Sequence, residues 1–288
     1  MCKLASLVGT IIVAVAVVHP ATSARLRAQS TSPHSGSTGA DITDATLSEP
    51  GATTRNISTG ELRKMLAAGR DILLLDTRPH LEWSLGHIPG ALNVDPKPGL
   101  TSAMYTADVA EIQRLAGGDK SRKLVLYCNG PFCGKSKRVC EDLLKAGYSN
   151  VQRYQLGAPV WRALGGVMVI EPDGAAHVAQ QDRTAVWLDA READAFARGT
   201  VAGARNLRRS GLRPGKDQGE VKAAKDDGRL PVNDHNTRII VFGQNGAEAR
   251  AVAEALASEA FHNVSFFDGS VESLRAALEI AAPKSQSR

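Results

Sequence analysis

The sequence predicts an α/β fold with two tandem domains, each a parallel sheet with helices on both faces. Two observations lead to this prediction. Short segments of continuous apolar residues alternate with helical patterns, which is typical of parallel strands that are buried on both faces. A long series of residues also occurs twice at a constant offset, which indicates a duplicated domain. With 288 residues, the chain has room for two domains.

The repeated residues lie 113 positions apart, as Asp76 and Asp189 show. A period of this length corresponds to a whole domain rather than to a solenoid unit. The apolar segments 124–127 and 239–242 also match, so the repeat includes strands as well as loops. The other matching positions are Thr77, Arg78, Trp83, Gly86, Gly90, Ala91 and Asn93 in the first unit and Ala190, Arg191, Phe196, Gly199, Gly203, Ala204 and Asn206 in the second.

The elements of the first unit can be predicted in chain order. A capping box at residues 58–61, Ser-Thr-Gly-Glu, marks the start of a helix whose apolar face contains Leu62, Met65 and Leu66. Ligands of parallel sheets bind beyond the carboxyl ends of the strands, so a site is expected there. After the first helix we expect a strand at 72–76, a helix at 108–115, a strand at 123–127, a helix at 137–146, a strand at 151–154 and a short helix from 160.

The N-terminal residues have the features of a secretory signal. Lys3 precedes an apolar run from Leu4 to Val18, and small residues at 21–24 suit cleavage. We therefore expect a signal peptide at residues 1–24 and a periplasmic or secreted protein. An uncleaved N-terminal anchor is the alternative, and no other membrane contact is expected. Residues 25–55 are rich in Ser, Thr, Gly and Ala, which predicts a disordered tether.

One stretch accounts for the whole net charge of +5. Residues 198–229 contain nine Lys and Arg against four Asp and Glu. Such a stretch either docks an acidic protein partner on the second domain or forms a solvated loop. It contains no aromatic residue to stack on bases, so nucleic-acid binding is not expected. No His and carboxylate cluster has the spacing of metal ligands, and no nucleotide-type phosphate loop is present, so we expect neither a metal nor a cofactor.

Three cysteines follow the predicted signal peptide, in two kinds of setting. Cys140 shares a helix face with Leu143 and Leu144, which predicts a small buried residue. Cys128 ends the strand 123–127 and faces the start of a helix, where unpaired N–H groups and the helix dipole favour an anion. Such surroundings favour the thiolate, which is the nucleophilic form of cysteine, and they also suit an anionic substrate.

The segment Asp76–Val94, which reads DTRPHLEWSLGHIPGALNV, resembles the signature of rhodanese domains. Together with the strand, cysteine, loop and helix that follow, the resemblance covers residues 56–168. Residues 184–282 resemble the same family more weakly, and residues 169–183 are expected to link the two domains. The resemblance implies a tandem rhodanese-like protein in which each domain has a parallel sheet of about five strands.

The resemblance also implies an activity, that of a sulfurtransferase with Cys128 as the catalytic nucleophile. In the family, this cysteine takes the outer sulfur of thiosulfate or a similar anionic donor as a persulfide. It then passes the sulfur to cyanide or another thiophilic acceptor. Lys135 lies near a position where the family often has an arginine. The residues whose backbone N–H groups would bind the persulfide and the donor are Asn129, Gly130, Phe132, Cys133, Gly134, Lys135 and Ser136.

Two features depart from the family pattern. Six residues lie between Cys128 and Lys135, where the common loop has four, and related phosphatases and arsenate reductases have longer loops. An oxyanion of the phosphate or arsenate type is therefore an alternative substrate, although phosphatase loops normally end in arginine, whose fork suits phosphate better than lysine does. In the second domain, Gly243 aligns with Cys128 and no cysteine follows Cys140, so we expect this domain to be inactive.

Cys133 has three open interpretations: a resolving partner of Cys128, a second sulfur carrier, or a spectator. A disulfide between the two would close a short loop, and labile disulfides of this kind can form a redox-controlled inactive state. Besides sulfur transfer, the alternatives are a thiol redox or oxyanion enzyme that uses both cysteines and a non-enzymatic sulfur carrier or binding protein. Asp76 and Arg78 recur in the cysteine-free unit, which indicates a structural role, and His87 is interpreted as a loop-ordering residue.

Overall fold

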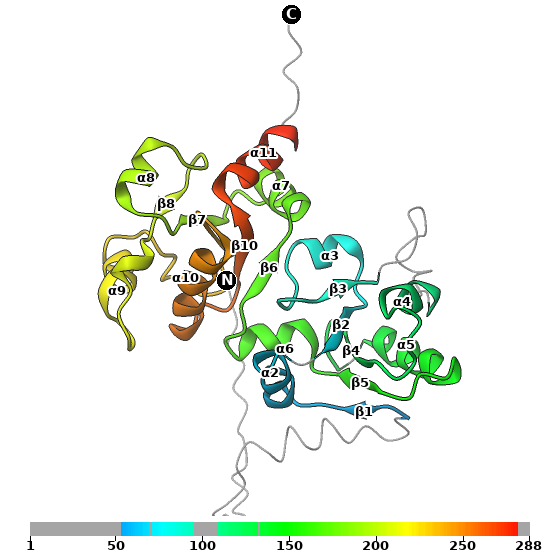
Figure 1. Ribbon diagram of the computed structural model, residues 1–288. Helices are drawn as coiled ribbons and strands as arrows, with labels where there is room; N and C mark the ends of the chain where they lie inside the picture. The colour runs from blue at the N-terminus through cyan, green and yellow to red at the C-terminus, as the bar shows by residue number, and fades with distance from the viewer. Residues whose placement is uncertain (1–52, 70, 95–108, 132, 282–288) are drawn as a thin grey trace, which may run out of the picture. The chain divides into compact units, whose positions relative to one another are not determined.

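The computed structural model describes residues 53–69, 71–94, 109–131 and 133–281. These residues form two five-stranded sheets with strand orders β1-β5-β4-β2-β3 and β6-β10-β9-β7-β8 (Figure 1). Neighbouring strands in both sheets are parallel, which confirms the predicted fold class. The predicted signal peptide and most of the predicted tether lie outside the described residues. Among the described helices, none has the length and apolar character needed to cross a membrane.

The first domain starts as the capping box predicts. The Ser58 hydroxyl accepts a hydrogen bond from the Glu61 N–H, and the Glu61 carboxylate accepts one from the Ser58 N–H. Helix α2 follows directly, so a local sequence signal sets its start. In chain order the domain consists of β1 (Arg55–Asn56), α2 (Thr59–Ala67), β2 (Ile72–Asp76), α3 (His80–Ser84), β3 (Leu92–Asn93), α4 (Val109–Leu115), β4 (Lys123–Tyr127), α5 (Gly134–Lys145), β5 (Val151–Tyr154) and α6 (Gly157–Ala163).

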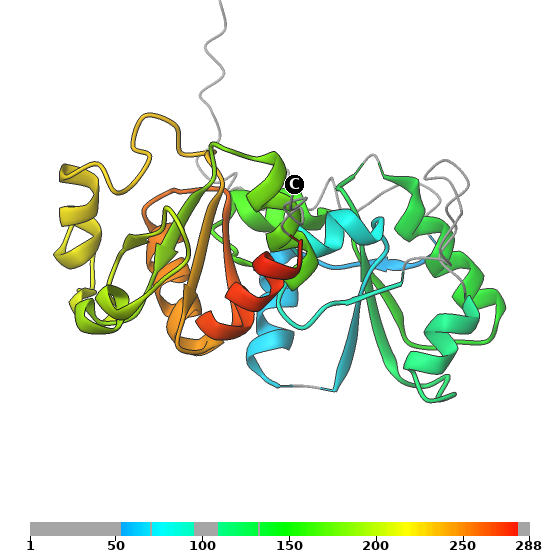
Figure 2. The ribbon, with the colours of Figure 1, turned by 90° about the horizontal axis from the view of Figure 1, so that it is seen from above.

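Helices cover both faces of the first sheet, as Figures 1 and 2 show. The central strand β4 alternates between the two layers. Val125 and Tyr127 pack with residues of α2 and α6, whereas Leu124 and Leu126 pack with residues of α4 and α5. Because both faces are buried, the strand is an unbroken apolar run in the sequence.

The second domain starts earlier than we expected. Residues 169–183, expected to be a linker, contain most of β6 and nearly all of α7, and β6 is an edge strand of the second sheet. β6 and α7 begin at Met168 and Pro172, 113 residues after Arg55 and Thr59 in β1 and α2, so the repeat extends back to them. The domain consists of β6 (Met168–Ile170), α7 (Pro172–Gln181), β7 (Val186–Asp189), α8 (Ala193–Arg198), β8 (Arg205–Asn206), the 3₁₀ helix η2 (Arg209–Gly211), α9 (Gly219–Asp226), β9 (Ile239–Gly243), α10 (Gly246–Ser258), β10 (Val264–Ser270) and α11 (Val271–Ala281).

Strand register aligns the central strands of the two domains. Tyr127 of β4 and Phe242 of β9 each lie opposite the aspartate that ends the neighbouring strand. The residue after each is therefore the equivalent position. Gly243 takes the place of Cys128 in the second sheet, as the sequence alignment predicts.

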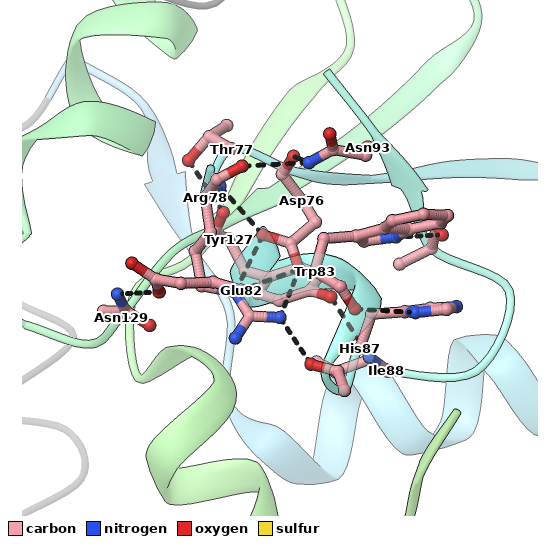
Figure 3. Close-up of polar contacts among 12 residues, drawn as sticks. Asp76, Thr77, Arg78, Glu82, Trp83, His87, Ile88, Asn93, Tyr127 and Asn129 are labelled. Carbon is pink, nitrogen blue, oxygen red and sulfur yellow. Dashed lines mark hydrogen bonds and ion pairs between the residues drawn. The ribbon is translucent and has the colours of Figure 1, made fainter. Parts of the chain in front are cut away.

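The same buried ion pair follows β2 in the first domain and β7 in the second. The Arg78 Nε donates to the Asp76 carboxylate at 3.0 Å, and its guanidinium also donates to the Gly86 carbonyl at 2.7 Å (Figure 3). Asp189 and Arg191 repeat the first contact at 3.0 Å. Since the second domain has no cysteine, the recurrence of the pair supports a role in the fold rather than in thiol chemistry.

The basic stretch 198–229 is folded and extensively paired. Arg208 and Arg229 both contact the Glu220 carboxylate, at 2.9 and 2.7 Å. Lys225 contacts two further carboxylates at 2.7 Å each. These pairs reduce the positive charge available to an acidic partner. The stretch is not the loop of the second interpretation, because it contains β8, η2 and α9.

Candidate active site

Cys128 lies at the carboxyl end of the central strand β4, where the sequence predicts the site. It is only 2% exposed, and its carbonyl accepts a hydrogen bond from the Ala158 N–H at 3.0 Å. Gly157, the first residue of α6, has a φ of 66°, and a Cβ there would lie 2.2 Å from the Cys128 carbonyl oxygen. Only glycine permits both, so the start of α6 fixes the backbone of the cysteine.

A disulfide joins Cys128 to Cys133, with the two Cα atoms 6.3 Å apart. The loop between them turns at Gly130, which has a φ of 104°, and the Cys133 N–H donates to the Gly130 carbonyl at 3.0 Å. Of the three interpretations of Cys133, a partner of Cys128 is the one that this geometry favours. The structure contains the oxidised pair, so nucleophilic chemistry at Cys128 requires reduction first.

Helix α5 begins directly after Cys133, with Gly134, Lys135 and Ser136 in its first turn. This turn contains no acidic residue, and the Cys133 side chain makes no capping hydrogen bond to it. The helix therefore presents first-turn N–H groups and the positive end of its dipole to the loop. Lys135 and Lys137 are half-buried beside them. Such an arrangement suits an anion next to the cysteines.

Two of the predicted site residues have side chains that are engaged elsewhere. Ser136 is 1% exposed, and its hydroxyl accepts a hydrogen bond from Arg153 Nε at 3.0 Å, so its side chain is bonded to β5. Asn129 is exposed, and its side-chain amide donates to the Glu82 carboxylate from α3 (Figure 3). The loop thus has an acidic neighbour, Glu82, at its edge. Phe132 lies outside the described residues.

Sequence reasoning missed Arg153. This β5 residue is 2% exposed, and besides Ser136 it contacts the Cys133 carbonyl, to which Nη2 donates at 3.2 Å. One guanidinium therefore connects the last loop residue and the first turn of α5 to the sheet. The repeat contains the signal that would have found it. In the second domain the positions of Arg153 and Ser136 hold Phe266 and Ala249, so both members of the polar pair become apolar there.

Other titratable groups of the first domain are packed into its interior. Cys140 is fully buried, and burial raises the pKa of its thiol to about 12, so the thiol stays protonated. Burial lowers the pKa of His87 to about 4, and the neutral ring stacks on Trp83 and bonds its carbonyl through Nδ1 at 3.2 Å. Both observations support the structural interpretations. In the part of the chain that the structure describes, no three His, Cys, Asp or Glu side chains gather as metal ligands do.

In the second domain, a carboxylate from the following helix bonds to the corresponding loop. Helix α10 starts three residues after Gly243, whereas α5 starts six residues after Cys128. Asn245 caps α10 by accepting a hydrogen bond from the Glu248 N–H at 2.9 Å. The Glu248 carboxylate in turn accepts one from the Gln244 N–H at 2.7 Å. Side chains of this segment therefore occupy two N–H groups, those of Gln244 and Glu248, that could otherwise bind an anion.

The Rhodanese-like domain family matches this chain twice, over residues 58–164 and 175–277. The chain belongs to this family. The second match begins at residue 175, within α7, which agrees with the early start of the second domain. Membership and the sulfurtransferases among its relatives support a sulfurtransferase at the level of the family.

Three relatives illustrate this similarity. An HTH-type transcriptional regulator of Mycobacterium tuberculosis is 33% identical over 126 residues, which cover 44% of this chain and 50% of the relative. The probable adenylyltransferase/sulfurtransferase MoeZ of the same species is 32% identical over 118 residues, 41% of this chain and 26% of the relative. A thiosulfate:glutathione sulfurtransferase of Saccharomyces cerevisiae is 30% identical over 100 residues, 33% of this chain and 68% of the relative. The chain spans half or less of the first two relatives.

Proposed function

We propose that this protein transfers a sulfane sulfur from thiosulfate, or a similar anionic donor, to a thiophilic acceptor through a persulfide on Cys128. The observation that supports this most directly is the position of Cys128. It ends the central parallel strand and is followed by a loop and by a helix whose first turn has no acidic residue. The similarity to a yeast thiosulfate:glutathione sulfurtransferase makes thiosulfate and glutathione the first donor and acceptor to test.

The reaction starts from reduced Cys128. Its thiolate attacks the outer sulfur of thiosulfate, an S–S bond forms on Cys128, and sulfite leaves with the electron pair of the broken S–S bond. The acceptor then attacks the outer sulfur of the persulfide, and the Cys128 thiolate is regenerated. Both the donor and the persulfide are anionic, so the N–H groups at the start of α5 and the nearby lysines stabilise them.

The anion-binding groups favour sulfur transfer over oxyanion chemistry. The half-buried cation of the first turn is Lys135, a point charge, whereas phosphate and arsenate are best held by the planar fork of an arginine. Arg153 does not supply that fork to the loop, because its side chain is buried and bonds Ser136 and the Cys133 carbonyl. We therefore place an oxyanion substrate second to thiosulfate.

The cellular setting and the second domain belong to the proposal as well. The apolar N-terminal run supports a periplasmic or secreted protein. The second domain has no thiol, and its loop is filled by Glu248, which supports a domain without sulfur chemistry of its own. A protein partner for that domain stays a hypothesis based on its basic composition.

Cyanolysis of the pre-reduced protein tests the proposed function. We expect thiocyanate to form from thiosulfate and cyanide with the wild type, and to fall to background with Cys128→Ser. Cys140→Ala is the matched control, because the repeat already has an alanine at this position, Ala253, which is buried in α10. Thiocyanate production that survives Cys128→Ser would rule out the role assigned to this cysteine.

A further inference from the structure

The loop brings the sulfurs of Cys128 and Cys133 together, although the proposed sulfur-transfer cycle requires only Cys128. Cys128 and Cys133 are five residues apart and disulfide-bonded, and their Cα separation of 6.3 Å lies within the usual range for a disulfide. Helix α5 still begins at Gly134, directly after the bonded cysteine. The folded loop therefore lets the two sulfurs meet without unwinding the helix.

The backbone of Cys133 is held from two sides. Its N–H donates to the Gly130 carbonyl at 3.0 Å, and its carbonyl accepts a hydrogen bond from Arg153 at 3.2 Å. These contacts fix where its Cα lies relative to Cys128. From this position its sulfur reaches the Cys128 sulfur, to which it is bonded.

Cys133 occupies the N-cap position of α5, where a cysteine is not among the preferred residues. In the second domain the N-cap is Asn245, and its side chain accepts a hydrogen bond from Glu248 N–H, as helix starts prefer. In the first domain the N-cap is Cys133, which makes no such bond. The chain thus gives up a capping interaction in the domain with the reactive strand end and places a second thiol there.

We propose that Cys133 resolves the Cys128 persulfide and releases the outer sulfur as hydrosulfide, so that the protein is a sulfide-releasing enzyme as well as a sulfur carrier. The proposal rests on the proposed function, because it needs the persulfide. The Cys133 sulfur attacks the Cys128 Sγ. The bond between Cys128 Sγ and the outer sulfur breaks, and the Cys128–Cys133 bond forms.

The step is balanced without any other reactant. The persulfide anion and the Cys133 thiol become the disulfide and HS⁻, which takes the thiol proton and the electron pair of the broken bond. The outer sulfur is reduced to the level of sulfide, and the two cysteine sulfurs are oxidised to a disulfide. The disulfide in the structure is therefore the product state of this step.

A further turnover requires a dithiol reductant, and the burial of the two cysteines predicts its point of attack. Cys128 is 2% exposed, whereas Cys133 is more accessible. The dithiol therefore attacks the Cys133 sulfur, and Cys128 leaves as the thiolate near the N–H groups at the start of α5. The dithiol then closes its own disulfide, which frees Cys133.

The test is a single turnover without any external thiol. The full-length protein is reduced, freed of reductant under argon and mixed with thiosulfate, and then sulfide and intact mass are measured after alkylation. The wild type is expected to release close to one sulfide per chain and to end with a disulfide mapped to Cys128 and Cys133. Cys133→Ser and Cys133→Asn are expected to retain one added sulfur and to release less than a tenth of the wild-type sulfide.

Matched controls separate this proposal from the one it rests on. Cys133→Asn installs the capping residue of the second domain, so its helix start is preserved, and Cys140→Ala should behave as the wild type. Wild-type protein that keeps its persulfide, or a Cys133 variant that releases as much sulfide as the wild type, overturns the resolving role while sulfur transfer stands. Failure of the wild type and of both Cys133 variants to take up sulfur overturns the proposed function too.

Discussion

The two domains share a fold and differ most where their central strands end. In the first domain, Cys128 is followed by a six-residue step to α5, a second cysteine and an uncapped helix start. In the second, Gly243 is followed by a three-residue step and a helix capped by Asn245, and the Glu248 carboxylate accepts a hydrogen bond from the loop N–H of Gln244. The duplication thus supplies an internal control: whatever recurs in both domains serves the fold, and whatever occurs only beside the cysteines is a candidate for chemistry.

The same comparison separates two buried arginines. Arg78 recurs as Arg191, and each is paired with an aspartate. Arg153 does not recur, because Phe266 takes its place, and its partner Ser136 becomes Ala249. A buried polar pair can often be replaced by apolar residues with little loss of stability. The second sheet forms without such a contact, so the Arg153–Ser136 pair is a candidate for holding the loop that carries Cys133.

Replacing the active-site loop by the loop of the second domain should cause the largest loss of activity. Replacing residues 128–133 by Gly-Gln-Asn, the sequence of 243–245, removes both cysteines and shortens the step to the helix. We expect sulfur transfer to fall by more than about a thousandfold, which corresponds to about 4 kcal/mol in the activation barrier. Cyanolysis measures the loss, and circular dichroism shows whether the domain stays folded. An unfolded first domain would mean that the longer loop is required by the fold.

Breaking the shared ion pair should affect stability equally in the two domains. Asp76→Ala and Asp189→Ala each leave a buried guanidinium without its carboxylate, and about 3–5 kcal/mol of stability should be lost in the mutated domain. Hydrogen exchange of β4 and β9 peptides reports each domain separately. A loss confined to activity, with unchanged exchange in β4, would give Asp76 a chemical role and contradict the structural assignment.

Acidification should lower the stability of the first domain more than that of the second. The reason is that His87 has no counterpart, since the repeat has Thr200 at its position. The pKa of His87 is about 4 in the folded chain, against about 6.5 when exposed. The unfolded state binds the extra proton, so stability is lost as pH falls from about 6.5 to 4, by up to about 3 kcal/mol. His87→Thr should flatten the pH dependence of exchange in β4, and a steeper loss in β9 would contradict this.

Substitution of Arg153 should cause the smallest loss of stability. A double variant can then show whether stability and activity depend on this residue in different ways. Arg153→Ala leaves the Ser136 hydroxyl and the Cys133 carbonyl without this donor and should cost about 1–3 kcal/mol. The double variant Arg153→Phe/Ser136→Ala copies the second domain and should recover most of that stability. Its kcat should stay about tenfold low, about 1.4 kcal/mol, with little change in KM, because the loop is no longer fixed. Full recovery of kcat would make the contact purely structural.

Much of this fold was predictable because its signals are local or repeated. The apolar runs gave the parallel strands, the capping box gave the start of α2, and the repeat aligned Gly243 with Cys128. The start of the second domain was missed, although the same offset leads from Arg55 to Met168. That strand is short and at the edge of the sheet, so the sequence pattern around it is weak.

The site was predictable in outline and not in its contacts. The strand end and the helix start placed Cys128, because both are set by periodicity. The disulfide depends on the path of the loop backbone, which no periodic pattern specifies, so Cys133 stayed open between three interpretations. Arg153 was missed because an arginine in a strand is ordinarily an exposed residue. Its replacement by Phe266 in the repeat indicates a buried position, but its contacts with Ser136 and the Cys133 carbonyl depend on the fold.

The most direct test is the location of a transferred sulfur in the Cys133→Asn variant, where the persulfide cannot be resolved. After reduction and incubation with thiosulfate, peptide mass spectrometry should find one added sulfur on the peptide that contains Cys128 and none at Cys140. An unmodified Cys128 in a folded, fully reduced protein would contradict the account.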